Sequence, residues 1–201
     1  MTTTTSGISG WHPYGPDAVL IEFDDPDDRW LAECSVALES VVGARTVMLR
    51  FDPARHRAGD VAAAVALSTR QPTAAREHVI PVSYDGPDLN DVAQRAGISV
   101  AEVVRRHVTS QFQAEFFGFA PGFAYLSGLD PHLRSPRRSD PRPRVPSGAV
   151  AIADQYCAVY PTDSPGGWQL LGTTHIALFD PGQDPPSLIR PGDTVRFEER
   201  T

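Results

Sequence analysis

The second half of this 201-residue chain is divided into short apolar runs by glycine and proline. After Ser110 no helical period is visible, and each apolar run soon ends at a turn-forming element. Runs of this length, separated by such turns, are typical of a small all-β barrel or sandwich. The expected strands cover residues 113–119, 149–153, 158–160, 169–171, 176–179 and 194–198.

The first part of the chain mixes strand and helix patterns. AVLIEF at residues 18–23 and ARTVMLRF at residues 44–51 predict strands. Between them, apolar residues recur at three- and four-residue steps over residues 27–42, which predicts an amphipathic helix with acidic residues at its start. An alanine- and valine-rich segment at residues 59–69 predicts a second helix. The order strand, helix, strand, helix favours a small α+β unit.

The segment that joins the two patterns predicts one strand and two short helices. HVIPVSY at residues 78–84 indicates a strand near a sheet edge, because proline cannot donate to a sheet ladder. Helices are expected at residues 89–96 and 100–108. Ser99, three residues before Glu102, predicts a capping box at the start of the second helix.

These patterns predict two domains. Residues 1–77 are expected to form a small α+β domain. Residues 78–201 are expected to form an all-β barrel domain with two short helices at its start.

All eighteen basic residues of the chain are arginines. The missing lysine excludes a P-loop lysine, a Schiff-base lysine and a biotin-carrying lysine. If the protein handles ATP, arginines and backbone amides must therefore hold the phosphates. The net charge of −7 argues against a nucleic-acid partner, because phosphate binding needs a positive field.

Nothing in the sequence indicates a membrane or an export pathway. No apolar run approaches the roughly eighteen residues of a membrane-spanning helix. Residues 1–10 lack the basic start and apolar centre of a secretion signal. Cys34 and Cys157 lie far apart and form no metal-type or redox-type pair. We therefore expect a cytoplasmic protein with reduced thiols and no membrane contact.

No catalytic residue can be assigned from the sequence. Ser164, His175 and Asp180 suggest a hydrolase triad, but Ser164 is followed by proline and lacks the G-x-S-x-G elbow. A turn hydroxyl is the simpler reading of Ser164. The six histidines show no ligand-like spacing, so no metal site is expected.

Two Pro-Gly turns indicate a pocket. FFGFAPGFAYL at residues 116–126 and SPGGW at residues 164–168 each interrupt an aromatic, strand-like run. Tyr125 and Trp168 are either core aromatics or pocket walls, and the adjoining glycines favour walls because they permit a close backbone approach.

The arginines of residues 134–144 have two interpretations. They are either solvated or bind an anion or a partner, and the prolines between them stiffen the loop and favour binding. Arg137 and Arg138 are the candidates. The expected pocket residues are Phe119, Pro121, Gly122, Tyr125, Arg137, Arg138, Pro146, Gly148, Ser164, Pro165, Gly166, Gly167 and Trp168.

Four long motifs resemble the PxpB/KipI family, also called allophanate hydrolase subunit 1. They are FFGFAPGFAYLSGLD at residues 116–130, SPRRSDPRPRVPSGAVAIA at 135–153, VYPTDSPGGWQLLGTT at 159–174 and IRPGDTVRF at 189–197. The resemblance runs in order and spacing from about Val79 to Glu198.

The resemblance implies a cyclophilin-like β-barrel after a small α+β domain. It also implies two partners, a PxpC-like protein (also called allophanate hydrolase subunit 2) and a PxpA-like third protein. In bacterial 5-oxoprolinase these three components open 5-oxoproline to glutamate with ATP, so ATP with Mg²⁺ is expected at the level of the complex. Related domains occur in urea carboxylase.

The same resemblance implies two alternatives, because one fold serves several functions. The first is a KipI-like regulatory protein that binds and inhibits a sensor histidine kinase. The second, a self-sufficient peptidyl-prolyl isomerase, follows from the barrel type alone.

The chain departs from the family pattern at two places. Tyr156-Cys157-Ala158 stands where relatives usually carry Gln-Thr-Gly, and Thr173 stands where they usually carry Arg or His. Both departures bear on which amide is the ligand: 5-oxoproline, allophanate, urea or another.

Overall fold

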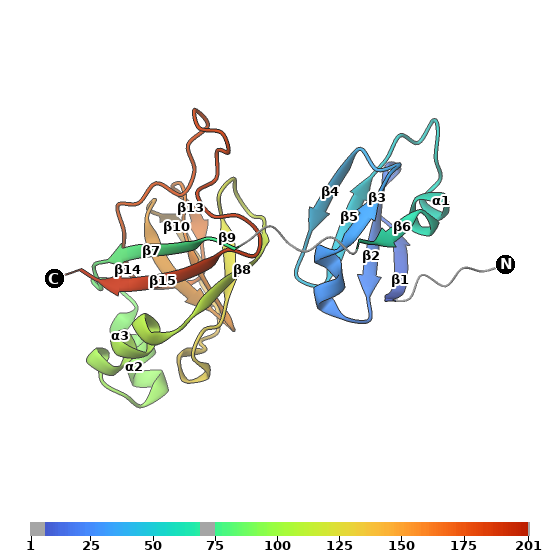
Figure 1. Cartoon of the computed structure of the whole chain (residues 1–201). Helices are drawn as coiled ribbons and strands as arrows, with labels where there is room; N and C mark the ends of the chain where they lie inside the picture. The colour runs from blue at the N-terminus through green and yellow to red at the C-terminus, as the bar shows by residue number, and fades with distance from the viewer. Residues whose placement is uncertain (1–6, 69–74, 201) are drawn as a thin grey trace. The chain divides into compact units, whose positions relative to one another are not determined.

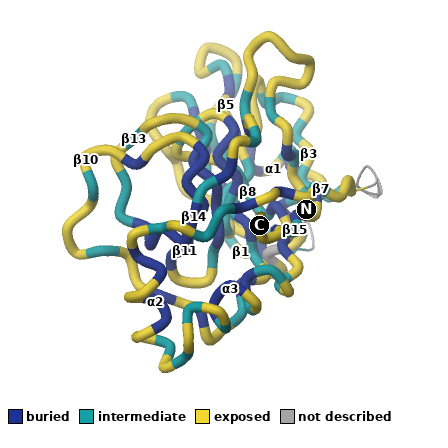
Figure 2. Tube along the Cα trace, turned by 90° about the vertical axis from the view of Figure 1, so that its left-hand side faces the viewer, coloured by how far each residue is buried: buried dark blue, intermediate teal, exposed yellow. Residues whose placement is uncertain are grey.

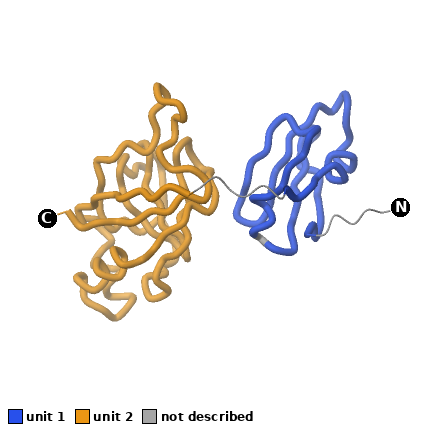
Figure 3. The backbone as a smooth tube through the Cα atoms, in the orientation of Figure 1, with its two compact units in different colours: residues 1–73 blue, residues 74–201 orange. Residues whose placement is uncertain are grey.

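The computed structural model describes residues 7–68 and 75–200 and divides the chain into two compact units, residues 1–73 and 74–201 (Figure 3). Each unit has its own hydrophobic core. None of the helices in the described part of the chain has the length and hydrophobicity needed to cross a lipid bilayer.

The first unit is built on an antiparallel four-stranded sheet (Figure 1). In spatial order its strands are β1 (Ile8–Pro13), β2 (Ala18–Phe23), β5 (Thr46–Arg50) and β4 (Glu39–Val42). A small second sheet pairs β3 (Ala32–Cys34) with β6 (Val65–Leu67). The helical elements are the 3-10 helix η1 (Pro26–Trp30) and the six-residue helix α1 (Ala58–Ala63).

The amphipathic helix expected at residues 27–42 is wrong. The segment forms η1, then β3, then β4, and the second expected helix ends at Ala63 before β6 begins. The cause is pairing between distant segments: Ala32 lies opposite Leu67 and Cys34 opposite Val65. Both Ala32 and Cys34 pack on the core of this unit, so strand pairing buries the apolar residues that the helical spacing would have placed on one face.

The second unit is organised around a seven-stranded, barrel-like sheet (Figure 1). Its strands, in spatial order, are β14 (Gln169–Thr173), β11 (Ala149–Ala153), β12 (Tyr156–Val159), β9 (Ala124–Ser127), β8 (Phe112–Phe117), β15 (Thr194–Glu199) and β7 (Glu77–Val82).

The ring of strands is closed by a bridge between its two edges. Ser83 follows β7, and its backbone N–H donates to the carbonyl of Thr173 at 2.9 Å, while the Thr173 N–H donates back at 2.8 Å. The β15–β7 pair is parallel and the other pairs of the ring are antiparallel. All seven strands contribute side chains to one core, which is the interior of the barrel-like sheet.

Strand β11 is buried on both faces, which Figure 2 shows as a dark blue stretch. Val150 and Ile152 point into the barrel core, because successive side chains of a strand alternate between faces. On the opposite face Ala149, Ala151 and Ala153 join a second cluster that is rich in aromatic rings. Small alanines on that face leave room for those rings.

Two helices pack together against the sheet, α2 (Leu89–Ala96) and α3 (Val100–Thr109), at the positions the sequence predicts (Figure 1). The Ser99 hydroxyl caps α3 by accepting from the Glu102 N–H at 3.2 Å, which is one half of the expected capping box; the Glu102 carboxylate accepts instead from Arg105 and Arg106. The strand expected at residues 176–179 is wrong, since this stretch forms only one isolated bridge, between Phe179 and Ser187.

Short elements complete the second unit. The 3-10 helix η2 (Pro131–Leu133) precedes the arginine-rich loop of residues 134–144. This loop runs into β10 (Arg142–Val145), which pairs with β13 (Ser164–Gly166) in a two-stranded ribbon.

Candidate functional site

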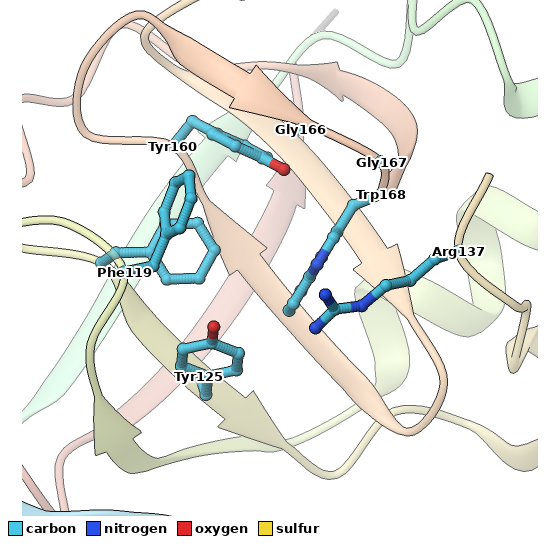
Figure 4. A pocket seen from close by; sticks show the side chains of 8 residues that line it. Phe119, Tyr125, Arg137, Tyr160, Gly166, Gly167 and Trp168 are labelled. Carbon is cyan, nitrogen blue, oxygen red and sulfur yellow. The ribbon is translucent and has the colours of Figure 1, made fainter. Parts of the chain in front are cut away.

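An aromatic cavity of about 70 Å³ lies beside the β10–β13 ribbon (Figure 4). Segments from three parts of the second unit form it: the first Pro-Gly turn with β9, the arginine-rich loop, and the second Pro-Gly turn with the residue that follows β12. Its lining residues are Phe119, Phe123, Tyr125, Arg137, Tyr160, Gly166, Gly167 and Trp168.

The rings of the cavity meet edge to face around Phe123. The ring centroid of Phe123 lies 5.1 Å from that of Tyr125, 5.3 Å from that of Tyr160 and 5.6 Å from that of Trp168. These separations and steep interplanar angles are the arrangement that aromatic quadrupoles favour. Because Phe123, Tyr160 and Trp168 are buried against the alanine face of β11, the walls are rigid.

Gly166 is required by the close approach of the Tyr160 ring. A Cβ on Gly166 would collide with the phenol of Tyr160, including its hydroxyl oxygen. At the neighbouring Gly167 a Cβ would meet only ordinary van der Waals contacts, 3.6 Å from the Arg138 backbone oxygen and 3.7 Å from Pro141. The first glycine of this turn therefore shapes the cavity and the second does not.

Phe119 stands at the rim in an unfavourable backbone conformation. Its φ of 71° lies in the left-handed region, which costs a bulky residue of order 1–3 kcal/mol. Phe119 is 59% exposed. Its ring contacts the rings of Phe123 and Tyr160 edge to face. An exposed, strained phenylalanine at a cavity mouth indicates a contact surface rather than a core position.

Arg137 brings the positive charge of the cavity. Its guanidinium carbon lies 5.9 Å from the centre of the Trp168 ring, at the distance of a cation–π contact (Figure 4). Within residues 7–68 and 75–200, no carboxylate forms an ion pair with Arg137. The charge is therefore available to an anionic or carbonyl group of a ligand.

Two tyrosine hydroxyls complete the polar groups of the cavity, and Figure 4 shows that of Tyr125 directed inward. Burial raises the pKa of Tyr125, and the nearby Arg137 only partly offsets this. Burial likewise raises the pKa of Tyr160. Both phenols therefore stay protonated near neutral pH and can donate a hydrogen bond to an oxygen of a ligand.

Arg138 does not line the aromatic cavity. Its Nη1 donates to Oδ1 of Asp88 at 3.1 Å, and Arg142 Nη2 donates to the same oxygen at 2.7 Å. The other carboxylate oxygen of Asp88 accepts from the backbone N–H of Leu170 at 2.7 Å. Arg138 thus has a clear structural contact, and its predicted role in binding stays a prediction.

The remaining predicted pocket residues lie outside the aromatic cavity. Pro121 and Gly122 line a separate apolar groove of about 390 Å³ together with Pro185 and Pro186. Ser164 and Pro165 lie in β13, and Pro146 and Gly148 lie in the turn between β10 and β11.

Two residues of the hypothetical triad, Ser164 and Asp180, make local turn contacts. The Ser164 hydroxyl donates to the Thr162 carbonyl at 3.4 Å. A carboxylate oxygen of Asp180 accepts from the Gly182 N–H at 2.9 Å. No hydrogen bond joins Ser164, His175 and Asp180 to one another within the described chain.

Sequence reasoning missed three residues of this region. Phe123 and Tyr160 are cavity walls, and both lie in the motifs that surround the Pro-Gly turns, so their aromatic character was the available signal. Asp88 is only 2% exposed and holds two arginines, but it lies fifty residues from Arg138 and looks like a turn aspartate in the sequence. Nothing local indicates that long-range contact.

The closed mixed sheet and the aromatic cavity lie in a carboxyltransferase-type domain. The family model for "Carboxyltransferase domain, subdomain C and D" matches residues 11–189, so the chain belongs to this family. Within it, the chain belongs to the PxpB family.

Curated relatives are named as B-type subunits of 5-oxoprolinase. The protein of Escherichia coli O157:H7 is 50% identical over 121 residues, which are 59% of this chain and 56% of that protein. The protein of Bacillus subtilis (strain 168) is 46% identical over 121 residues, covering 59% of this chain and 50% of that protein. The chain spans about half the length of these relatives.

Solved structures share the fold over most of the chain. The crystal structure of TTHA0988 has a TM-score of 0.78 and 36% identity, covering 92% of this chain and 40% of that one. A conserved uncharacterized protein from Pyrococcus horikoshii has a TM-score of 0.60 and 30% identity, covering 95% and 97%. The Kluyveromyces lactis urea carboxylase, at 19% identity, covers 95% and 22% with a TM-score of 0.72 and shows the fold alone.

Proposed function

We propose that this chain is the PxpB component of an ATP-dependent amide-cleaving complex of the 5-oxoprolinase type, with a cyclophilin-like barrel that is active only beside a PxpC-like partner. In this proposal the aromatic cavity is the part of the substrate site that the chain supplies. A PxpA-like protein is the expected third component, and the complex is cytoplasmic.

The observation that carries the proposal is the composition of the cavity wall. The wall offers aromatic faces, two protonated phenols, one guanidinium and two glycines. These groups can bind and orient a small planar group with oxygen acceptors, such as an amide or a carboxylate. The wall holds no serine, cysteine, histidine or carboxylate to act as nucleophile or general base. Binding without chemistry is what a non-autonomous subunit would contribute.

The size of the cavity also supports a shared site. At about 70 Å³ it is roughly half of the 150 Å³ cavity that admits benzene in other proteins. It can enclose one end of a small molecule, and the rest would need walls from a partner. The exposed ring of Phe119 at the rim is suited to contact either the ligand or that partner.

ATP with Mg²⁺ is proposed for the complex and not for this chain alone. ATP would supply the driving force for opening a stable amide. In this lysine-free chain arginine side chains and backbone amides are the groups proposed to hold phosphates, and its described residues contain no group of three metal-ligating side chains. The residues of this chain would bind the substrate, exclude water from its aromatic side and orient it.

The proposal is tested by comparing the isolated chain with a complex made from the co-expressed pair, this chain and a PxpC-like protein, together with a PxpA-like protein. We expect 5-oxoproline-dependent ATP hydrolysis only from the complex, and a single peak for the pair in size-exclusion chromatography. Activity of the isolated chain, or two separate peaks at micromolar concentration, would contradict it.

The cavity itself is tested by Arg137→Ala in the complex. Loss of charge-assisted hydrogen bonds to the substrate should lower kcat/KM about tenfold to a hundredfold. Arg134→Ala, a matched change in the same loop at a residue outside the cavity, should stay within about twofold. Equal activity of both variants would show that Arg137 is not part of the site.

The KipI-like alternative gains no support from the relatives, which are named as enzyme subunits.

A further inference from the structure

A second hollow, of about 320 Å³, lies next to the aromatic cavity on the other side of Arg137. Helix α2 contributes Asp91 and Arg95 to it, and β14 contributes the buried Gln169. The arginine-rich loop supplies the remaining lining residues, which are Pro136, Arg137, Arg138 and Ser139. Unlike the aromatic cavity, this basic hollow is lined mostly by polar side chains.

Positive charge exceeds negative charge at this place. Arg95, Arg137 and Arg138 line the hollow with a single carboxylate, that of Asp91. Behind it, the Asp88 carboxylate is shared between Arg138 and Arg142. The lining therefore holds three guanidinium groups and one carboxylate, an excess of two positive charges in a chain whose net charge is −7, and the pair of Arg142 with Asp88 adds no charge to it.

Two of the arginines are free to take up a ligand. Neither Arg95 nor Arg137 forms an ion pair within the described residues, although Asp91 lies one helical turn before Arg95. Asp140 contacts Arg138 only through its backbone oxygen, at 3.4 Å from Nε. Asp91 is thus the only residue with a carboxylate that lines the hollow in the described part of the chain.

The floor of the hollow is held in place by hydrogen bonds. The Arg138 N–H donates to the Gly167 carbonyl at 2.7 Å, and Gln169 Nε2 donates to the Pro136 carbonyl at 2.8 Å. With Arg138 also fixed on Asp88, the loop that presents Arg137 is anchored at several points. An anchored backbone lowers the conformational entropy that the loop loses when an anion binds to Arg137.

We propose that the basic hollow is an anion site for a phosphoryl group. A phosphoryl dianion matches the excess of two charges, and its oxygens spread in three dimensions toward guanidinium groups that come from both α2 and the loop. A carboxylate carries one charge and two oxygens and would leave part of the excess unpaired. Arg137 borders both cavities, so it can contact a phosphoryl group in the hollow and a second ligand group beside Trp168.

The test measures binding of inorganic phosphate to the isolated two-unit chain by isothermal titration calorimetry at low ionic strength. Parent protein should bind phosphate, and Arg95→Ala should weaken binding about tenfold, the effect of losing one charge-assisted hydrogen bond. Arg134→Ala removes the same charge from the same loop outside the hollow and should change affinity less than about twofold. Arg95 is exposed and has no ion pair within the described chain, so its removal should not disturb folding, and thermal unfolding checks this.

Two further probes identify the source of the phosphoryl group. Tighter binding of Mg²⁺-free ATP than of inorganic phosphate, with loss in Arg95→Ala, indicates a nucleotide, whereas similar affinities indicate free phosphate. No binding of phosphate or ATP by the parent, equal weakening by Arg95→Ala and Arg134→Ala, or acetate binding as tight as phosphate binding would each overturn the site. Because no turnover is measured, this result is independent of the proposed amide cleavage.

Discussion

Arg138 donates from Nη1 to Oδ1 of Asp88 across 3.1 Å, which joins the arginine-rich loop to the residue before α2. The same carboxylate accepts from Arg142 and from the backbone N–H of Leu170 in β14. One buried side chain thus ties a helix start, a barrel strand and the loop that carries Arg137. The geometry of both cavities depends on this junction.

Replacing Asp88 should therefore destabilise the fold. In Asp88→Asn the half-buried guanidinium groups of Arg138 and Arg142 lose their buried counter-ion, and the loss of these charge-assisted hydrogen bonds should cost about 1.5–3 kcal/mol in the free energy of unfolding. Urea unfolding followed by circular dichroism measures the loss. Asp163→Asn is the matched control, because Asp163 pairs with Arg144 at an exposed position and should cost about 1 kcal/mol or less. Similar losses in both variants would contradict a structural role for the junction.

Sequence patterns predicted the elements in which the preferences of neighbouring residues agree with the contacts that the segment makes in the fold. β2 and β11 were expected with the bounds they have, because their apolar runs are buried and flanked by turns. Helix α2 was also expected with its observed bounds, and the Ser99 cap of α3 is confirmed. At residues 27–42 the apolar residues have helical spacing, but β3 pairs with β6 and the segment forms no α-helix.

The candidate site was predictable in outline and not in detail. Of the residues expected around the two Pro-Gly turns, Phe119, Tyr125 and Trp168 line one cavity, and their role in binding stays a prediction. The sequence could not separate Arg137 from Arg138, since adjacent residues of one loop look alike until the fold directs one to Trp168 and the other to Asp88. That separation depends on a contact fifty residues away along the chain.

Gly166→Ala should close the aromatic cavity. The added methyl group overlaps the Tyr160 ring, so the ring must move into the cavity or the β10–β13 ribbon must shift. Overpacking of this kind costs about 1–3 kcal/mol in stability, and substrate-dependent activity of the complex should fall more than stability does. Gly167→Ala, one residue later, meets only ordinary contacts and should retain both. Equal activity of the two variants would argue against the cavity as a substrate site.

Phe119→Gly should weaken binding of the partner or the substrate while it changes the free energy of unfolding little. Glycine relieves the cost of the left-handed backbone at this position, while the variant loses the edge-to-face contacts with Phe123 and Tyr160. These effects oppose each other, so the free energy of unfolding should change by less than about 1 kcal/mol. Affinity for a PxpC-like partner or the KM for substrate should nevertheless worsen. A variant with parent-like KM and partner affinity would show that the exposed ring has no binding role.

A chain of polar contacts joins α3 to the barrel core. The Tyr84 hydroxyl lies 2.7 Å from His107 Nδ1, and His107 Nε2 lies 3.3 Å from the Cys157 sulfur. Burial lowers the pKa of His107 to about 3 and raises the pKa of the Cys157 thiol and of the Tyr84 phenol. All three groups are therefore uncharged near neutral pH, and Cys157 should resist thiol reagents until the protein unfolds.

His107 should make the fold less stable in mild acid. Between its ordinary pKa of about 6.5 and its folded pKa of about 3, the unfolded chain binds a proton that the folded chain does not, so stability falls as the pH drops through this window. From pH 7 to pH 5 this amounts to about 2 kcal/mol, since one pKa unit is about 1.4 kcal/mol. His107→Gln, which keeps hydrogen-bonding groups beside Tyr84 and Cys157, should flatten the change in urea midpoints, whereas His132→Gln at an exposed site should leave most of it. A parent-like pH dependence in His107→Gln would assign the acid sensitivity to other groups.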